Sequence, residues 1–130
     1  MTGLDTNVLV RYFVQDDAVQ SRRAFEIIDR FTEDEPGFIS LVTMIEMVWV
    51  LGSTYGQSDQ QIAKYIERML QADTLFVQNE EEVFTAVVAL KSGRGSFDDA
   101  LIGALGKWAG CRSTLTFDKK AARIGGFELV

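Results

Sequence analysis

The alternation of short apolar stretches with amphipathic helical stretches most constrains the fold of this chain. Strands are expected before Asp5 and at 38–39, 74–77, 112–116 and 127–130, and helices at 8–13, from 16, at 41–55, from 58, at 80–90, from 96 and at 119–124. This order predicts a mainly parallel sheet covered on both faces. We therefore expect an α/β fold with a short, mainly parallel β-sheet of four to five strands, flanked by about seven helices, in a single domain over residues 1–130.

Composition indicates a globular protein of a reducing compartment. Hydrophobic residues make up 47% of the chain, with one proline and no repeated tract, so there is enough apolar material for a core. The single Cys111 excludes an internal disulfide. The N-terminus lacks a signal-peptide pattern, and the longest apolar run, 41–51, is too short to span a bilayer and is broken by Glu46. We expect a cytoplasmic protein with no membrane association.

Two absences limit the chemistry. The chain has no histidine, which excludes Ser-His-Asp and Cys-His sites and any hydrolysis that depends on paired imidazoles. A single cysteine without histidine also argues against zinc. Carboxylates are abundant, and they suit hard ions such as magnesium or manganese. A hydrolase with this composition is expected to depend on a metal.

Three acids stand where helices begin. Asp5 ends the first expected strand, and the crevice outside the carboxyl ends of strands is where open α/β sheets bind ligands. Asp99 lies in the first turn of the helix from 96, and Asp118 follows the strand 112–116. Helix capping is the alternative for these acids, and Ser96 with Asp99 has the spacing of a variant capping box.

Glu46 is the acid that capping does not explain. It lies in the most apolar helix, where its neighbours one turn away are Val42, Thr43, Trp49 and Val50. Burying a solitary ionised carboxylate on such a face is costly. Glu46 is therefore expected to be protonated, paired with a cation or bound to a metal, and an Arg or Lys partner from elsewhere in the chain is the structural alternative.

Charge is unevenly distributed although the net charge is −6. Residues 1–85 carry 15 acidic and 6 basic side chains, and residues 86–130 carry 4 acidic and 7 basic ones. Three of the four acids in the basic segment, Asp98, Asp99 and Asp118, are candidate site residues, so a bound cation would make the segment more positive. Its basic side chains are then available to meet phosphates, although ordinary solvated helix faces explain each of them equally well.

Four motifs together resemble a known family. They are Leu4-Asp5-Thr6-Asn7-Val8-Leu9-Val10, the mid-helix Glu46, Phe97-Asp98-Asp99-Ala100-Leu101-Ile102 and Thr116-Phe117-Asp118. In the order and spacing of these motifs the chain is similar to the PIN-domain ribonucleases, and most of all to the VapC-type toxins of bacterial toxin–antitoxin pairs. The similarity covers essentially the whole chain.

The resemblance implies a PIN-like fold and a Mg²⁺- or Mn²⁺-dependent endoribonuclease that hydrolyses RNA phosphodiesters with metal-activated water. It also implies the toxin component of a toxin–antitoxin pair, forming a homodimer. The expected partner is a cognate antitoxin, which forms a higher assembly with the toxin and blocks its active site. The antitoxin also binds DNA, so that the toxin contacts DNA only through the antitoxin.

The catalytic and metal-binding acids implied by the resemblance are Asp5, Glu46, Asp99 and Asp118. Asp99 is chosen as the third acid because the family acid immediately precedes Ala-Leu-Ile. Asp98 occupies a variable position and is expected to help from the outer shell. Thr6, Asn7 and Thr116 are expected to support the site by orienting metal-bound water or phosphate.

Two other functions stay open. A phosphatase using Asp5 as nucleophile would need a second acid two residues later, and that position is Asn7. In a noncatalytic PIN-like binding module the acids would serve only as caps. Failure to bind divalent ions would favour the binding module.

Overall fold

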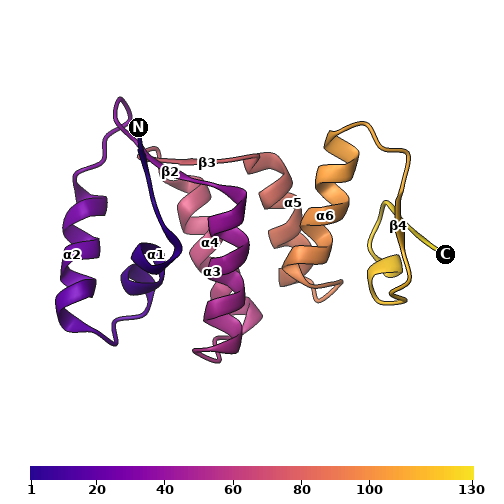
Figure 1. Cartoon of the computed structure of the whole chain (residues 1–130), viewed down its shortest axis with the longest axis horizontal. Coiled ribbons are helices and arrows are strands. Elements are labelled where there is room, and N and C mark those ends of the chain that lie inside the picture. Colours follow the sequence, from indigo (N-terminus) through magenta and orange to yellow (C-terminus); the bar gives the residue numbers. More distant parts are fainter. The chain divides into compact units, whose positions relative to one another are not determined.

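The computed structural model describes all 130 residues, which divide into two compact units (Figure 1). Unit 1 comprises Met1–Gln78 and unit 2 comprises Asn79–Val130. Unit 1 is drawn in indigo to pink and unit 2 in red to yellow in Figure 1.

Unit 1 is built on a three-stranded parallel sheet. Strand β2 is central, with β1 and β3 on either side, and Thr2 and Leu75 both pair with Gly37. Parallel pairing requires a crossover between successive strands, and pairs of helices supply both crossovers. The elements are β1 (Thr2–Gly3), α1 (Thr6–Phe13), α2 (Ala18–Asp29), β2 (Gly37–Ile39), α3 (Leu41–Ser53), α4 (Asp59–Gln71) and β3 (Leu75–Val77).

Side-chain caps explain where three helices of unit 1 begin. Asp17, Ser40 and Ser58 each have extended backbone and accept the N–H of the third residue after them. A capping oxygen satisfies one of the donors that a first helical turn leaves free. The helix starts predicted at Ser40 and Ser58 are confirmed.

The core of unit 1 is made by one face of each main helix and the central strand. Helix α3 contributes side chains at helical spacing, and α4 does the same with a strongly amphipathic sequence. Gly37 in β2 is also part of this packing, because a Cβ atom there would lie 2.6 Å from the Phe31 ring. The largest fully buried side chains of the unit are Leu9, Ile39, Met44, Met47, Leu51, Ile62 and Ile66.

Unit 2 has two helices followed by a two-stranded parallel sheet. Strands β4 and β5 pair in parallel, with Thr114 opposite Phe127 and Thr116 opposite Leu129. Ser96 begins α6 by accepting the N–H of Asp99. The elements are α5 (Glu80–Lys91), α6 (Phe97–Trp108), β4 (Thr114–Thr116), the 3-10 helix η1 (Ala121–Arg123) and β5 (Phe127–Leu129).

Glycines on α6 admit side chains from the strands of unit 2. A Cβ atom at Gly103 would lie 2.6 Å from the Phe127 ring, and one at Gly106 would lie 2.7 Å from the Thr114 hydroxyl. Gly110 follows the end of the helix, with a φ of +91°.

The predicted α/β class with parallel strands is confirmed, with two differences in detail. The five strands form a three-stranded sheet and a two-stranded sheet rather than one sheet. Six α-helices form instead of about seven, because the segment 119–124 contains only the 3-10 turn Ala121–Arg123. The turn after Asp118 and the Gly125-Gly126 pair leave too few residues between them for an α-helix.

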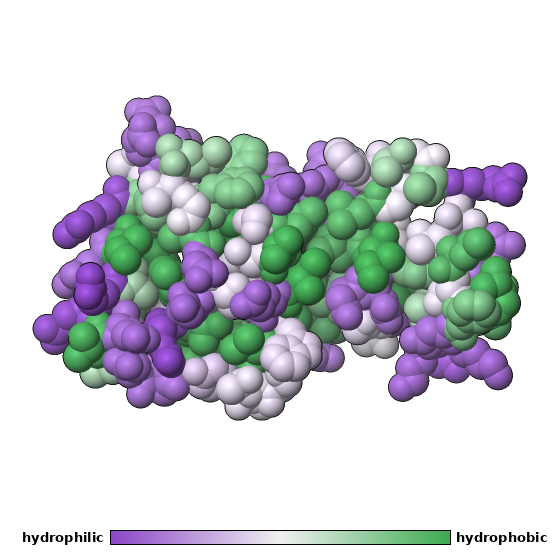
Figure 2. All heavy atoms as spheres, viewed as in Figure 1, coloured by the Kyte–Doolittle hydropathy of each residue, from purple (hydrophilic) through white to green (hydrophobic).

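Some large apolar side chains remain on the surface. Leu115 in β4, Phe117 directly after it and Leu129 in β5 are exposed, and Figure 2 shows green, hydrophobic atoms at the end of unit 2 where the chain terminates. Over α2, in contrast, most of the visible atoms are hydrophilic. None of the helices has both the length and the apolar character needed to cross a membrane.

Candidate functional site

A cavity of about 190 Å³ in unit 1 brings two of the predicted acids together. Asp5, at the start of α1, and Glu46, in the middle of α3, both line it. The predicted supporting residues Thr6 and Asn7 line it as well. The remaining lining residues are Val10, Arg11, Val50 and Tyr55.

Asp5 is both a helix cap and a cavity residue. Its Oδ1 accepts the N–H of Thr6 at 2.8 Å, and the backbone of Asp5 is extended as an N-cap requires. The side chain of Thr6 is buried, whereas Asp5 and Asn7 are exposed. The cap uses one carboxylate oxygen and fixes the direction of the other, so capping and ligand binding are compatible at Asp5.

Glu46 is exposed, which corrects the expectation of a buried carboxylate. Its neighbours Thr43 and Val50 are buried and half-buried, but Val42 and Trp49 are 73% and 68% exposed. Apolar residues therefore lie on the exposed side of α3 as well as on its buried face. Neither an Arg nor a Lys of the chain forms an ion pair with Glu46.

A buried hydroxyl fixes the helix that carries Glu46 against the strand that leads to Asp5. Thr43 Oγ1 donates to the carbonyl oxygen of Leu4 at 3.3 Å and accepts from Ser40 Oγ at 3.2 Å. Leu4 N–H in turn donates to the carbonyl of Phe38 at 2.9 Å. The two acids thus project from backbone segments that are tied to each other.

Arg11 is a cavity residue that sequence reasoning missed. Its Nη1 donates to Asp16 at 2.6 Å and to the Tyr55 hydroxyl at 3.1 Å, and its Nε donates to Gln20 at 2.7 Å. The hydrogen bond to Asp16 raises the pKa of Arg11 above its usual value. The sequence feature that could have identified Arg11 is its spacing from Asn7. It lies four residues later, which places both side chains on the same face of the helix.

The predicted acids of unit 2 lie at the start of α6. The N–H of Asp99 donates to Ser96 Oγ at 3.3 Å, so Ser96 is the cap and Asp99 provides only its backbone. The side chain of Asp99 is half-buried and that of Asp98 is exposed. The carboxylate of Asp99 is therefore not consumed by the capping box.

Asp118 follows β4 in a tight turn. Its N–H donates to Thr116 Oγ1 at 3.0 Å, and its Oδ1 accepts the N–H of Lys120 at 2.8 Å. Asp118 is exposed. The Thr116 hydroxyl thus fixes the backbone conformation at Asp118.

The four predicted acids are divided between the two units. Asp5 and Glu46 belong to unit 1, and Asp99 and Asp118 belong to unit 2. No three acidic or cysteine side chains form a group able to hold a metal ion. Convergence of all four acids therefore stays a prediction.

The donors in the cavity of unit 1 have the chemistry that magnesium and manganese prefer. Two carboxylates and the side-chain amide of Asn7 provide hard oxygen atoms. The guanidinium of Arg11 is turned to Asp16 and Tyr55 by its hydrogen bonds. The residues present thus fit a hard divalent cation, with further ligands required from outside this cavity.

Comparison with protein families identifies the class. The PIN domain model matches residues 4–126, which include both units and all four predicted acids. The chain belongs to the PIN domain family, whose members are generally nucleases and typically use divalent metals. A search of curated proteins found no match.

Proposed function

We propose that this chain is a Mg²⁺- or Mn²⁺-dependent endoribonuclease and the toxin component of a toxin–antitoxin pair. The observation that carries the proposal is the shared cavity of Asp5 and Glu46 in a chain of the PIN family. Two acids from distant parts of unit 1 face one space, beside the amide of Asn7. The motifs predict that Asp99 and Asp118 complete this site.

The residues of the cavity have distinct tasks in the proposed reaction. Asp5, Glu46 and Asn7 would hold the ion from unit 1, and Asp99 and Asp118 are the proposed ligands from unit 2. When bound, the ion supplies activation of water and charge stabilisation at the phosphodiester. The Thr6 N–H bond orients Asp5, and Thr43 sets the position of α3.

Arg11 adds a fixed positive charge beside the acids. Asp16, Gln20 and Tyr55 hold its guanidinium on one side of the cavity. A preorganised cation stabilises negative charge that develops on a phosphate without having to reorganise during the reaction. We assign Arg11 this electrostatic role.

An exposed apolar strip on α3 supports the proposed protein partner. Val42 and Trp49 are 73% and 68% exposed, and they flank Glu46. Exposed apolar side chains at a site are typical of surfaces that another protein covers. A cognate antitoxin that covers the acids is therefore part of the proposal, as are the homodimer and DNA contact made only through the antitoxin.

The test is to map RNA ends in cells that briefly express the chain without a partner. Asp5→Asn and Glu46→Gln keep size and hydrogen bonding but remove the charge. Asp34→Asn is the control, because it removes an exposed acid that does not line the cavity. We expect new ends at a few defined sites in the wild type and in Asp34→Asn. If the Asp5→Asn variant is folded and still produces the same RNA ends as the wild type, the assignment of Asp5 to an endoribonuclease site is disproved.

A noncatalytic binding module is the second candidate. Asp5 and Asp118 each use one oxygen for a backbone N–H, as acids with only a capping role would. This candidate requires that the protein does not bind divalent ions. A phosphatase that uses Asp5 is disfavoured by Asn7, which stands where that chemistry needs an acid.

A further inference from the structure

A second cavity, of about 570 Å³, lies within unit 2 and is lined by cationic side chains. It is bordered by residues of α5, α6, β4 and the segment 123–126. Its floor is made by small and apolar residues such as Ala89, Ala100 and Ile124. The lining includes no Asp or Glu, and its basic members are Arg94, Lys107, Arg112 and Arg123.

The four cations are not neutralised by acids of the chain. The ion pairs of Met1 with Glu35 and of Arg11 with Asp16 include none of them. Arg94 donates to a neutral partner, Ser92 Oγ, at 3.0 Å. All four cationic side chains are exposed. Glu128, which accepts from Ser113 at 3.0 Å, does not line the cavity. The four cations at this cavity therefore have neither an ion-pair partner nor an acid beside them in the lining.

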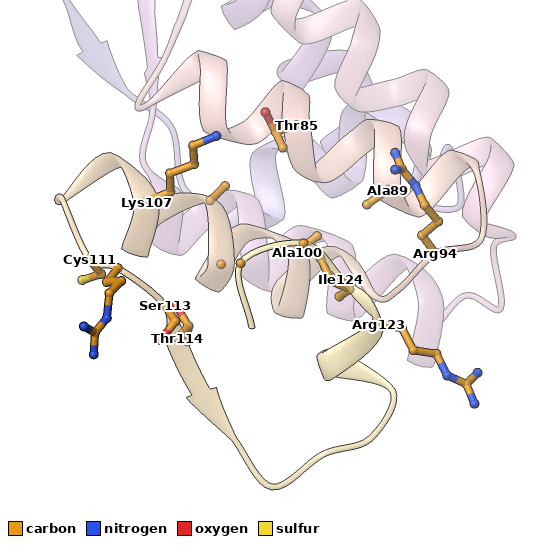
Figure 3. Close-up of a pocket in the computed structure, with 15 residues that line it drawn as sticks. Thr85, Ala89, Arg94, Ala100, Lys107, Cys111, Ser113, Thr114, Arg123 and Ile124 are labelled. Carbon is orange, nitrogen blue, oxygen red and sulfur yellow. The ribbon is translucent and has the colours of Figure 1, made fainter. Parts of the chain in front are cut away.

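The cationic groups stand apart around the cavity. Figure 3 shows Arg94 on one side and Lys107 on the other, with the guanidinium group of Arg123 pointing outward, and Arg112 belongs to the lining as well. A single phosphate would need several donors directed at one point. Separated cations instead fit a ligand that carries several anionic groups along its length.

We propose that single-stranded RNA runs across this cavity, with consecutive phosphates held by the four cationic residues. The proposal rests on the proposed function, since it places part of the RNA substrate on unit 2. Three of the four cations are arginines, whose N–H groups match phosphate oxygens in pairs. A flexible single strand carries one phosphate per nucleotide and reaches separated cations more readily than a compact anion does.

Equilibrium binding in the presence of a chelator tests the proposal without cleavage. The probe is a fluorescently labelled single-stranded oligoribonucleotide, and its anisotropy is measured with the full-length chain across a series of potassium chloride concentrations. Each phosphate contact to a single strand contributes about 0.7 to the slope of log K against log salt. Replacing the four cations with glutamine should therefore lower the slope by about three and weaken binding at low salt by tenfold or more.

A matched variant removes the same charge from another surface. Arg22, Arg23, Arg30 and Lys64 are exposed residues of unit 1, and their replacement by glutamine should leave the slope nearly unchanged. A third variant, with lysine at positions 94, 112 and 123, keeps the charge and should retain most of the binding. Circular dichroism and melting curves establish that each variant is folded.

The outcomes separate this proposal from the proposed function. Equal loss of binding in the cavity variant and its matched control, or no loss in either, would overturn the RNA surface even if the wild type cleaves RNA. Loss confined to the cavity variant supports it even if Asp5→Asn leaves cleavage unchanged. Displacement of RNA by polyglutamate or inorganic triphosphate at comparable charge concentration would reject RNA in favour of an acidic protein segment or a small polyphosphate.

Discussion

Thr43 and Leu4 join the two parts of unit 1 that carry the candidate acids. The Thr43 hydroxyl donates to the Leu4 carbonyl at 3.3 Å in the interior of the unit. Leu4 immediately precedes Asp5, and Thr43 lies one helical turn before Glu46. The separation of the two carboxylates therefore depends on a hydrogen bond made by neither of them.

Replacing Thr43 with valine should loosen this connection. Valine has nearly the same shape but leaves the Leu4 carbonyl without its buried donor, which costs about 1–2 kcal/mol. We expect a melting temperature lower by a few degrees and weaker RNA cleavage. Thr54→Val, at an exposed position after α3, is the control and should change neither. Wild-type cleavage by Thr43→Val would show that the bond does not position the acids.

Substitutions at Asp5 should separate its capping role from its charge. The side-chain oxygen of asparagine can accept the Thr6 N–H as that of aspartate does. The free energy of unfolding of Asp5→Asn should therefore lie within a few tenths of a kcal/mol of the wild-type value. Alanine removes the cap and should cost about 1 kcal/mol. Urea unfolding measures both. Equal stability of the two variants would mean that the cap contributes nothing.

Divalent ions should stabilise the folded chain. A ligand that binds only the folded state at a hundred times its Kd adds about 2.7 kcal/mol of stability. Magnesium or manganese should therefore raise the melting temperature of the wild type and of Asp34→Asn, and raise it less in Asp5→Asn and Glu46→Gln. An unchanged wild-type melting temperature would favour the binding module.

The Arg11–Asp16 pair should make stability depend on acid pH. Burial alone raises the pKa of Asp16, but hydrogen bonds from Arg11 and Tyr55, with the charge of Arg11, outweigh it and hold that pKa below its usual value. The stability from this pair is thus present above the unfolded pKa of about 3.9 and is lost as pH falls through the lower folded pKa.

The substitution Asp16→Asn tests this dependence. The variant should be less stable than the wild type at neutral pH, and the difference should shrink as the pH falls below about 4. Urea unfolding across this range measures it. A constant difference at every pH would show that ionisation of Asp16 is not involved.

Two glycines of α6 should respond differently to alanine. At Gly103 the new Cβ meets the Phe127 ring, whose displacement costs about 1–3 kcal/mol and exceeds the gain in helix propensity of about 1 kcal/mol. At Gly106 it meets only the Thr114 hydroxyl, which can turn away. Gly103→Ala should lower the melting temperature and Gly106→Ala should maintain or raise it. The reverse order would contradict the packing described for unit 2.

Several local features were predictable because their causes are local. Ser40, Ser58 and Ser96 begin helices as expected, since a cap depends on the few residues that follow it. The parallel pairing followed from the order of strands and helices. The family likewise follows from short motifs in a fixed order, and these include all four candidate acids.

Other features depend on packing between distant segments. The sequence placed Glu46 on an apolar helix, but only the tertiary structure determined that Val42 and Trp49 remain exposed and that Glu46 does too. Arg11 gained its role from contacts with Asp16 and Tyr55, the second of which comes from the end of α3.

The sequence by itself determined the class of fold, the helix starts and the identity of the candidate acids, because these depend on local chemistry and order. The tertiary structure decided that Asp5 and Glu46 share one cavity and that four cationic side chains line a second cavity. Such groupings arise from the packing of segments far apart in the chain, which spacing alone does not specify.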